Sequence, residues 1–172
     1  MINPFKKTFT PQEMSLFRFL SKVKVFEDLD YKELSYFVPF LHEREYKRDE
    51  IVFFRGDPSQ AFYIIKKGRV SLSVDIEDKF EMLDELKTNQ SFGDNAFLNN
   101  TRRIYTSMIT SDEAILYVIP RVNIHEIFDR EVEVKAKVMQ SLSSQYNEYT
   151  TNLFKAYQSS FGFFDLGKVY KS

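Results

Sequence analysis

Residues near the middle of the chain have side chains suited to binding a small anion. Gly93 has no Cβ and lets an anion approach the backbone closely. Residues 94–97, Asp-Asn-Ala-Phe, can begin a short helix whose free N–H groups and dipole favour a phosphate. Arg103 adds a permanent, fork-shaped cation for the same anion, and Thr106 adds a hydroxyl. These residue types predict a binding site for a phosphate-bearing small molecule.

The rest of the sequence offers little catalytic or metal-binding chemistry. A metal site needs several convergent ligands, but His42 and His125 lie far apart and the chain has no cysteine. No serine lies in a Gly-x-Ser-x-Gly motif, and the 5 glycines form none of the loops that bind nucleoside triphosphates or dinucleotides. We therefore expect a chain that is not an enzyme, with no catalytic residue and no metal ion.

Composition is typical of a globular domain. The 172 residues fit one core, and the 18 Phe and 10 Tyr are too many for a disordered segment. The 24 basic and 25 acidic residues nearly cancel, so the chain as a whole does not attract nucleic acid or anionic lipid. No apolar run approaches the roughly 18 residues of a membrane span. We expect a cytoplasmic domain with no membrane partner.

Sequence patterns divide the chain into helical and strand-rich parts. Residues 1–45 predict a helical lead-in, in which Thr10 and Asp30 can cap two helices. Residues 46–120 contain short segments rich in β-branched and aromatic residues, separated by turn signals. These segments lie at 50–54, 61–65, 69–74, 80–86, 104–109 and 114–119. Together they predict a mainly β fold, an antiparallel β jelly-roll barrel with N-terminal helices and a long C-terminal helix.

The C-terminal part, residues 121–160, predicts two helices, followed by a tail at 161–172. The second helix carries apolar residues that alternate in steps of three and four, as in a coiled coil: Met139, Leu142, Tyr146, Tyr149, Leu153 and Ala156. Residues 139–164 contain only Glu148 and Lys155 as charges, which favours burial on more than one side. We expect a homodimer that forms through this stripe.

Several segments, in this order and spacing, resemble the cyclic nucleotide-binding domain family, the effector domain of catabolite activators and of protein kinase regulatory subunits. The matching segments lie at 51–57, 62–65, 67–70, 92–98 and 103–106, and the lead-in at 26–34 is also similar. Phe-Gly-Asp-Asn-Ala-Phe at 92–97 is similar to the family's Phe-Gly-Glu-x-Ala-Leu. Arg-Ile-Tyr-Thr at 103–106 is similar to its Arg-x-Ala-Ser/Thr.

This resemblance implies a non-catalytic sensor that binds cyclic AMP or cyclic GMP between the barrel and the C-terminal helix, without another cofactor. Residues 92–106 would form the phosphate-binding cassette. Its ligand-binding residues would be Phe92, Gly93, Asp94, Asn95, Ala96, Arg103, Ile104 and Thr106. In the family pattern the phosphate-binding arginine is followed three residues later by a serine or threonine. Arg103 meets this spacing with Thr106, whereas Arg102 is followed at that distance by Tyr105. Ligand would act by moving the C-terminal helix.

Departures from the family pattern leave two other interpretations open. Asp94 is one methylene shorter than the family's glutamate, and Ile104 and Tyr105 are bulky where the family prefers small residues. A degenerate barrel that serves as a protein-interaction scaffold without ligand is therefore the main alternative. A cupin-like barrel enzyme is the other, and the lack of a histidine-rich metal set argues against it. DNA binding is not expected, because only residues 161–172 follow the long helix.

Overall fold

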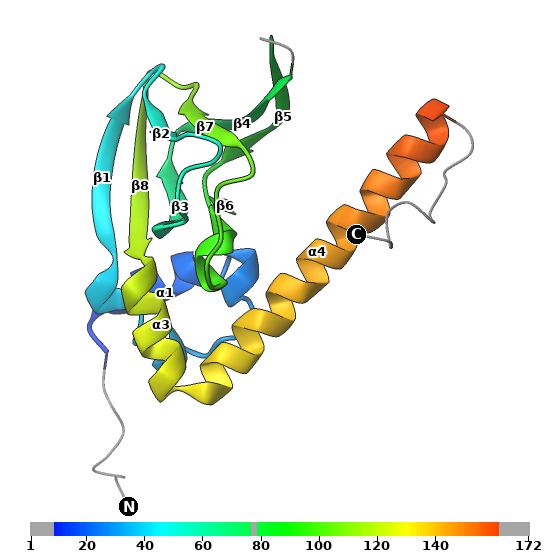
Figure 1. Ribbon diagram of the computed structural model, residues 1–172. Coiled ribbons are helices and arrows are strands. Elements are labelled where there is room, and N and C mark those ends of the chain that lie inside the picture. Colours follow the sequence, from blue (N-terminus) through cyan, green and yellow to red (C-terminus); the bar gives the residue numbers. More distant parts are fainter. Residues whose placement is uncertain (1–8, 77–78, 162–172) are drawn as a thin grey trace, which may run out of the picture.

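The N-terminal lead-in begins at capping residues. The computed structural model describes residues 9–76 and 79–161. Thr10 caps α1 (Pro11–Leu20) and Asp30 caps α2 (Tyr31–Leu34), each with a glutamate three residues later that completes a capping box. Two short 3-10 helices, η1 (Lys24–Phe26) and η2 (Val38–Phe40), complete the lead-in, which lies beneath the barrel in Figure 1.

Within the described residues, eight strands form two four-stranded antiparallel sheets that face each other. One sheet has the order β1 (His42–Lys47), β8 (Glu113–Pro120), β3 (Ala61–Lys67), β6 (Ser91–Phe92). The other has the order β2 (Ile51–Phe53), β7 (Thr106–Ile109), β4 (Arg69–Ile76), β5 (Lys79–Lys87). Sheets and flanking helices together confirm the predicted jelly roll.

Two strands were not predicted, and their positions explain why. β1 begins at His42, so the barrel starts before residue 46, the predicted boundary. Most side chains of this edge strand are exposed, so it lacks the alternation of a half-buried strand. β6 has only two residues, too few for a pattern. β7 begins at Thr106 and not at 104, because Ile104 lies outside the sheet with 65% of its side chain exposed.

The buried residues form two clusters, one on each side of the β3–β8 sheet. The inner cluster fills the barrel and includes Phe53, Phe92 and Tyr105. The outer cluster lies between the sheet and the helices and includes Phe26, Phe62 and residues from the long C-terminal helix. The barrel interior is therefore lined by aromatic rings.

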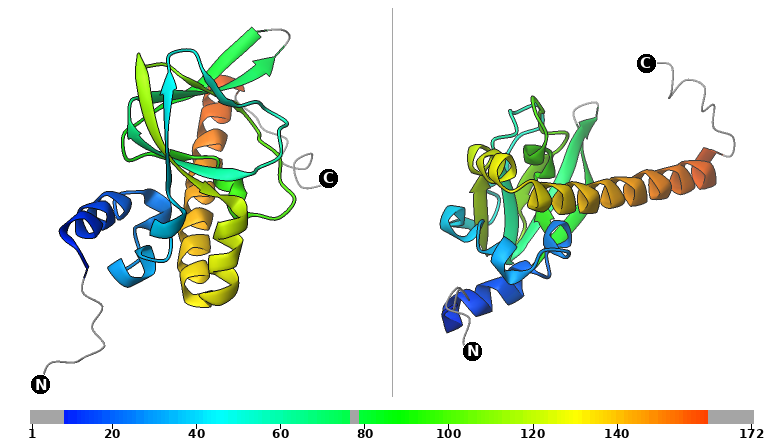
Figure 2. Two further views of the ribbon diagram at one scale, coloured as in Figure 1. Left: turned by 90° about the vertical axis from the view of Figure 1, so that its left-hand side faces the viewer. Right: turned by 90° about the horizontal axis from the view of Figure 1, so that it is seen from below.

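The long C-terminal helix is held along its first part only. It follows α3 (Arg121–Arg130) and is α4 (Val132–Phe161). Val138 and Leu142 are buried in the outer cluster, and Lys137 Nζ lies 2.7 Å from the Glu33 carboxylate. Ser141 donates a hydrogen bond of 2.7 Å to the Lys24 carbonyl. The second part of α4 extends beyond the barrel in Figure 1 and in the right-hand view of Figure 2.

The predicted seam on α4 is therefore divided. Leu142 is 2% exposed, and Met139 and Tyr146 pack against the chain's own core, so the first half of the stripe cannot face a partner. Tyr149 and Leu153 are 63% and 66% exposed. The prediction of one continuous intermolecular stripe was wrong because sequence periodicity does not say which surface covers an apolar face.

No helix in the described ranges is long and apolar enough to cross a membrane.

Candidate functional site

The cassette starts at a glycine that the local packing requires. The chain leaves β6, turns at Gly93 with φ +75°, and enters η3 (Asp94–Phe97). A Cβ at Gly93 would lie 2.6 Å from Arg103 Nη1 and 3.2 Å from the Ala61 carbonyl oxygen. Such a left-handed backbone is also costly for other residues. Glycine at this position therefore allows the close approach of Arg103, whereas it was expected from the sequence to allow the approach of an anion.

Arg103 is 3% exposed and reaches the cassette from its far end. Its Nη1 donates to the Gly93 carbonyl at 3.0 Å and its Nη2 to the Ala61 carbonyl at 2.6 Å. The guanidinium carbon lies 4.1 Å from the centre of the Phe53 ring. Burial lowers the pKa of Arg103, because a charged group is poorly solvated there. The carbonyls supply dipoles but no negative charge.

The positive charge of Arg103 is not balanced by a salt bridge within the described part of the chain. Among the described residues, no acid forms a salt bridge with Arg103, and its Nε has no hydrogen-bond partner. The carboxylate of Asp94 acts on the guanidinium only through its charge. A buried cation with an unused donor is energetically unfavourable unless another group completes its shell. A phosphate would provide both the charge and the acceptor.

Two tyrosines contact the cassette. Tyr105 is 8% exposed, and its hydroxyl accepts a hydrogen bond of 3.0 Å from the Gly93 N–H. Burial, and then the Asp94 charge, raise the pKa of Tyr105. Tyr146 on α4 is partly buried and packs against the outer cluster. Burial, followed by the charge of the Asp94 carboxylate, raises the pKa of Tyr146, so both tyrosines remain protonated at neutral pH.

The remaining predicted site residues have other surroundings. Phe92 stacks on Tyr63 with ring centres 5.0 Å apart, and Ala96 is fully buried in the outer cluster. The Thr106 hydroxyl accepts a hydrogen bond of 3.0 Å from the Arg55 N–H. Ile104 is exposed and is not part of the inner cluster. The structure thus brings Gly93, Asp94 and Arg103 together, whereas the side chains of Phe92, Ala96, Ile104 and Thr106 lie outside this group.

Asn95 and Arg102 also differ in what they contact. Asn95 is 8% exposed, and within the described part of the chain its Oδ1 has no hydrogen-bond partner. Arg102 is exposed and donates a hydrogen bond of 2.7 Å to the Gly56 carbonyl. Of these two arginines, Arg103 donates to the Gly93 carbonyl within the cassette, whereas Arg102 donates to the Gly56 carbonyl.

Sequence reasoning missed the roles of three aromatic residues. Phe53 and Tyr63 were interpreted as barrel core, which they are, but their rings also lie 4.1 and 5.6 Å from the Arg103 guanidinium. Tyr146 was assigned to an intermolecular seam. Asp94 and Tyr146 are far apart in the sequence, which gave no signal that the charge of Asp94 would act on Tyr146.

A cleft lies between α4 and the turn that joins β5 to β6. Its volume is about 360 Å³, within the range of small-molecule sites. Its walls include Leu86 and Ser91 from the barrel and Gln145 and Tyr149 from α4. Ser91 lies in β6, directly before the cassette, and the charge of Asp94 reaches Tyr149. The cleft is therefore beside the candidate site.

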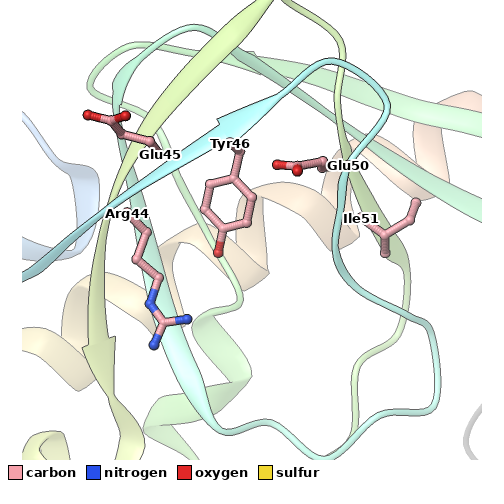
Figure 3. Close-up of a pocket in the computed structure, with 5 residues that line it drawn as sticks. All are labelled: Arg44, Glu45, Tyr46, Glu50 and Ile51. Carbon is pink, nitrogen blue, oxygen red and sulfur yellow. The ribbon is translucent and has the colours of Figure 1, made fainter.

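A second depression lies away from these residues, between β1 and β2. It measures about 630 Å³, and Figure 3 shows Arg44, Tyr46 and Glu50 pointing toward it. None of the predicted ligand-binding residues lines it, and its charges are of both signs.

Over the described residues, no group of three or more potential metal ligands occurs.

Comparisons with known proteins agree with this geometry. A model of the cyclic nucleotide-binding domain family matches residues 43–131. A cAMP-dependent protein kinase regulatory subunit of Debaryomyces hansenii is 26% identical over 153 residues, which cover 83% of this chain and 33% of that subunit. The chain thus spans a minor part of this relative.

Two solved structures share the fold. The regulatory domain of Toxoplasma gondii PKA, crystallised with cAMP, has a TM-score of 0.63 and 23% identity, and the match covers 70% of this chain and 46% of that one. The catabolite activator protein of Thermus thermophilus has a TM-score of 0.66 and 21% identity, with 77% and 62% covered. The family match extends from β1 through the cassette to α3. The chain belongs to the cyclic nucleotide-binding domain family, a family of regulatory domains.

Proposed function

We propose that this chain is a regulatory module that binds cyclic AMP or cyclic GMP at Gly93, Asp94 and Arg103. The observation that carries the proposal is the Arg103 guanidinium, which is buried at the family's cassette with no salt-bridge partner among the described residues. A cyclic phosphate supplies the missing charge, and a bidentate contact with arginine is among the strongest hydrogen-bonded pairs. The relative from Toxoplasma gondii was crystallised with cAMP.

The rest of the ligand would extend from the cassette toward α4. Asp94 is partly exposed and offers carboxylate oxygens to a ribose hydroxyl. The cleft beside Ser91 and Tyr149 has apolar and polar walls that suit a purine base. The ligand would therefore contact both the barrel and the helix, as the resemblance implies.

Movement of α4 would carry the signal. Its first part is attached to the lead-in through Lys137–Glu33 and Ser141–Lys24, and the charge of Asp94 acts on Tyr146. Ligand shifts the position of a helix only if it binds two positions with different affinity. A ligand that engages Asp94 changes the electrostatic surroundings of Tyr146, so its binding energy would differ between the two positions.

Thermal unfolding in the presence of nucleotides tests binding. A ligand of the folded state raises the melting temperature by mass action, by RT ln(1 + [L]/Kd) in free energy. Cyclic AMP or cyclic GMP at 1 mM should raise the melting temperature, whereas 5′-AMP, which lacks the cyclic phosphate, should not. An equal shift with 5′-AMP would indicate a general anion effect, and no shift with any of the three would contradict the proposal.

A scaffold without ligand is a second candidate, and one observation favours it. The Tyr105 hydroxyl already satisfies the Gly93 N–H, and the ring fills part of the barrel interior. In that case the exposed second half of α4 would bind a partner while the barrel stays empty of nucleotide. The nucleotide panel separates the two candidates, because a scaffold shows no cyclic nucleotide shift.

We expect Asp94→Glu to strengthen cyclic nucleotide binding by about threefold. The added methylene restores the reach of the family's glutamate toward the ribose, and a typical hydrogen bond contributes about 0.5 to 1.5 kcal/mol. Calorimetric titration measures the change, with Asp28→Glu on the exposed lead-in as the matched control. If neither Asp94→Glu nor Asp94→Ala alters the affinity, the carboxylate does not contact ligand.

The exposed second half of α4 supports a homodimer whose interface is shorter than the stripe predicted from the sequence. Tyr149 and Leu153 are exposed, and the charges on the adjoining surface are few. We expect a dimer of twice 20.5 kDa in sedimentation equilibrium, and the double variant Tyr149→Glu, Leu153→Glu should be monomeric and folded. Leu142 is excluded from this test because it is buried in the core. A wild-type monomer at high micromolar concentration would contradict the prediction.

A further inference from the structure

The two sheets of the barrel differ in what covers their outer faces. Helices pack on the sheet that contains β3 and β8, and these two strands supply the strand residues of the outer cluster. Among the described residues, no member of that cluster lies in β2, β4, β5 or β7. The outer face of the β2–β7–β4–β5 sheet therefore has no helical layer from the same cluster, although an apolar sheet face is stabilised by a second layer.

Strand register shows which side chains lie on this outer face. Ser73 alternates with Leu72 and Val74, which pack against the inner cluster, so Ser73 points outward. Met82 on β5 and Thr106 on β7 are the cross-strand partners of Ser73, and opposite residues of antiparallel strands share a face. Met82 is 62% exposed. The row across the three strands therefore ends in a large apolar side chain that faces solvent.

Two further apolar side chains border this row. Ile104 precedes Thr106 by two residues, and Phe54 directly follows β2; they are 65% and 57% exposed. Arg55 connects their segments, because its N–H donates to the Thr106 hydroxyl at 3.0 Å. The Arg55 guanidinium also forms a salt bridge of 3.0 Å with Asp75 on β4. The outer face thus presents apolar side chains beside an ion pair whose charges cancel.

The chain's own α4 lies on the opposite side of this sheet. Tyr149 on α4 lines the cleft together with Leu86 of β5, and Leu86 belongs to the inner cluster. The helix therefore approaches β5 from the inner side, whereas Met82 of the same strand faces outward. From there the second half of α4 extends away from the barrel (Figure 1). A layer that covers the outer face must come from another molecule.

We propose that the second half of α4 packs on the outer face of the β2–β7–β4–β5 sheet of a second copy of this chain, in a reciprocal contact. Tyr149 and Leu153 are four residues apart on one side of the helix and are 63% and 66% exposed. Residues 149–154 carry no charge, so they meet the neutral Arg55–Asp75 pair without repulsion. A reciprocal contact closes a twofold dimer. This inference rests on the homodimer expected above and names the surface that covers α4 in it.

The area of the contact favours this arrangement over pairing of the two helices alone. An apolar side chain that is about 60% exposed presents roughly 100 Å². Tyr149 and Leu153 would therefore contribute about 200 Å² per copy. With Phe54, Met82 and Ile104 the contribution rises to about 500 Å², closer to the ~800 Å² that each partner buries in a standard interface.

Sedimentation equilibrium of sheet variants tests this inference. The double variant Phe54→Ser, Met82→Ser should reduce the mass from twice 20.5 kDa to 20.5 kDa, and circular dichroism should show that it is folded, because both side chains are exposed. Val122→Ser, Val132→Ser is the matched control and should remain a dimer, since it removes two apolar side chains, each 71% exposed, from helices. A dimer that persists in the folded sheet variant would overturn the inference and leave the homodimer prediction intact. A wild-type monomer would overturn both.

Cysteine cross-linking identifies the surfaces that meet. The chain has no cysteine, so Leu153→Cys and Met82→Cys each introduce a single thiol. The two variants, co-expressed with different tags and treated with a short bismaleimide, should form a cross-linked pair that carries both tags. Asp28→Cys on the exposed lead-in is the control and should link to neither. Leu153→Cys linked only to itself would show that the helices meet each other and would overturn the inference. Neither measurement involves nucleotide, so both are independent of the proposed ligand.

Discussion

Replacing Arg103 with alanine is expected to weaken cyclic nucleotide binding by roughly 30- to 150-fold, because a charge-assisted contact in a buried site is worth about 2 to 3 kcal/mol. The side chain is 3% exposed and its guanidinium lies at the start of the cassette, where it contacts the Gly93 carbonyl. Calorimetric titration with cyclic AMP and cyclic GMP measures the loss.

Arg102→Ala is the matched control for this prediction. Arg102 is adjacent in sequence and also donates to a backbone carbonyl, that of Gly56, but it is exposed. Its loss should change the affinity by less than about twofold, since exposed polar contacts contribute little. Arg103→Lys keeps the charge without the fork, and should fall between the two variants. Far-ultraviolet circular dichroism confirms that each variant is folded. Equal losses in Arg102→Ala and Arg103→Ala would show that the assigned register is wrong.

Gly93→Ala is expected to destabilise the domain by about 3 to 5 kcal/mol. A left-handed backbone costs alanine about 1 to 2 kcal/mol. The new Cβ would also lie 2.6 Å from Arg103 Nη1, and Arg103 cannot move away freely because Phe53 and the Ala61 carbonyl confine it. Displacement of the guanidinium would therefore break buried hydrogen bonds, each worth about 1 to 1.5 kcal/mol.

Gly56→Ala isolates the effect of this contact. Gly56 has φ +87°, yet an added Cβ meets nothing within 4 Å. Urea denaturation should therefore show a loss of only about 1 to 2 kcal/mol for Gly56→Ala. Equal destabilisation of the two variants would mean that Arg103 and Gly93 are not in close contact, and the description of the site would have to be revised.

The fold could be predicted where the sequence contains local signals. The caps at Thr10 and Asp30, the turns with glycine or asparagine, and the alternation within β4 and β8 all depend on neighbouring residues. β1 was missed because it is an edge strand in which both faces carry charged side chains. Its place in the sheet is set by pairing with β8, a long-range contact that leaves no trace in residue pattern.

The residues of the candidate site could be identified from the sequence, but the groups that they contact in the structure could not. Gly93, Asp94 and Arg103 were identified from the order and spacing of one segment, and the structure places them together. The sequence also indicated that Tyr105 is bulky, and the structure shows where its hydroxyl lies. The effect of the Asp94 charge on Tyr146 of α4 depends on helix packing. For the same reason, periodicity alone assigned Leu142 to a seam when it belongs to the core.

Isothermal titration of the wild-type chain with cyclic AMP and cyclic GMP tests the central claim most directly. The account predicts saturable binding of at least one of them with one site per chain, and no binding of 5′-AMP under the same conditions. The same titration on Arg103→Ala should then show the loss described above. If neither cyclic nucleotide binds at millimolar concentration to the folded wild-type chain, the barrel has kept the family fold without its ligand, and the proposed function is wrong.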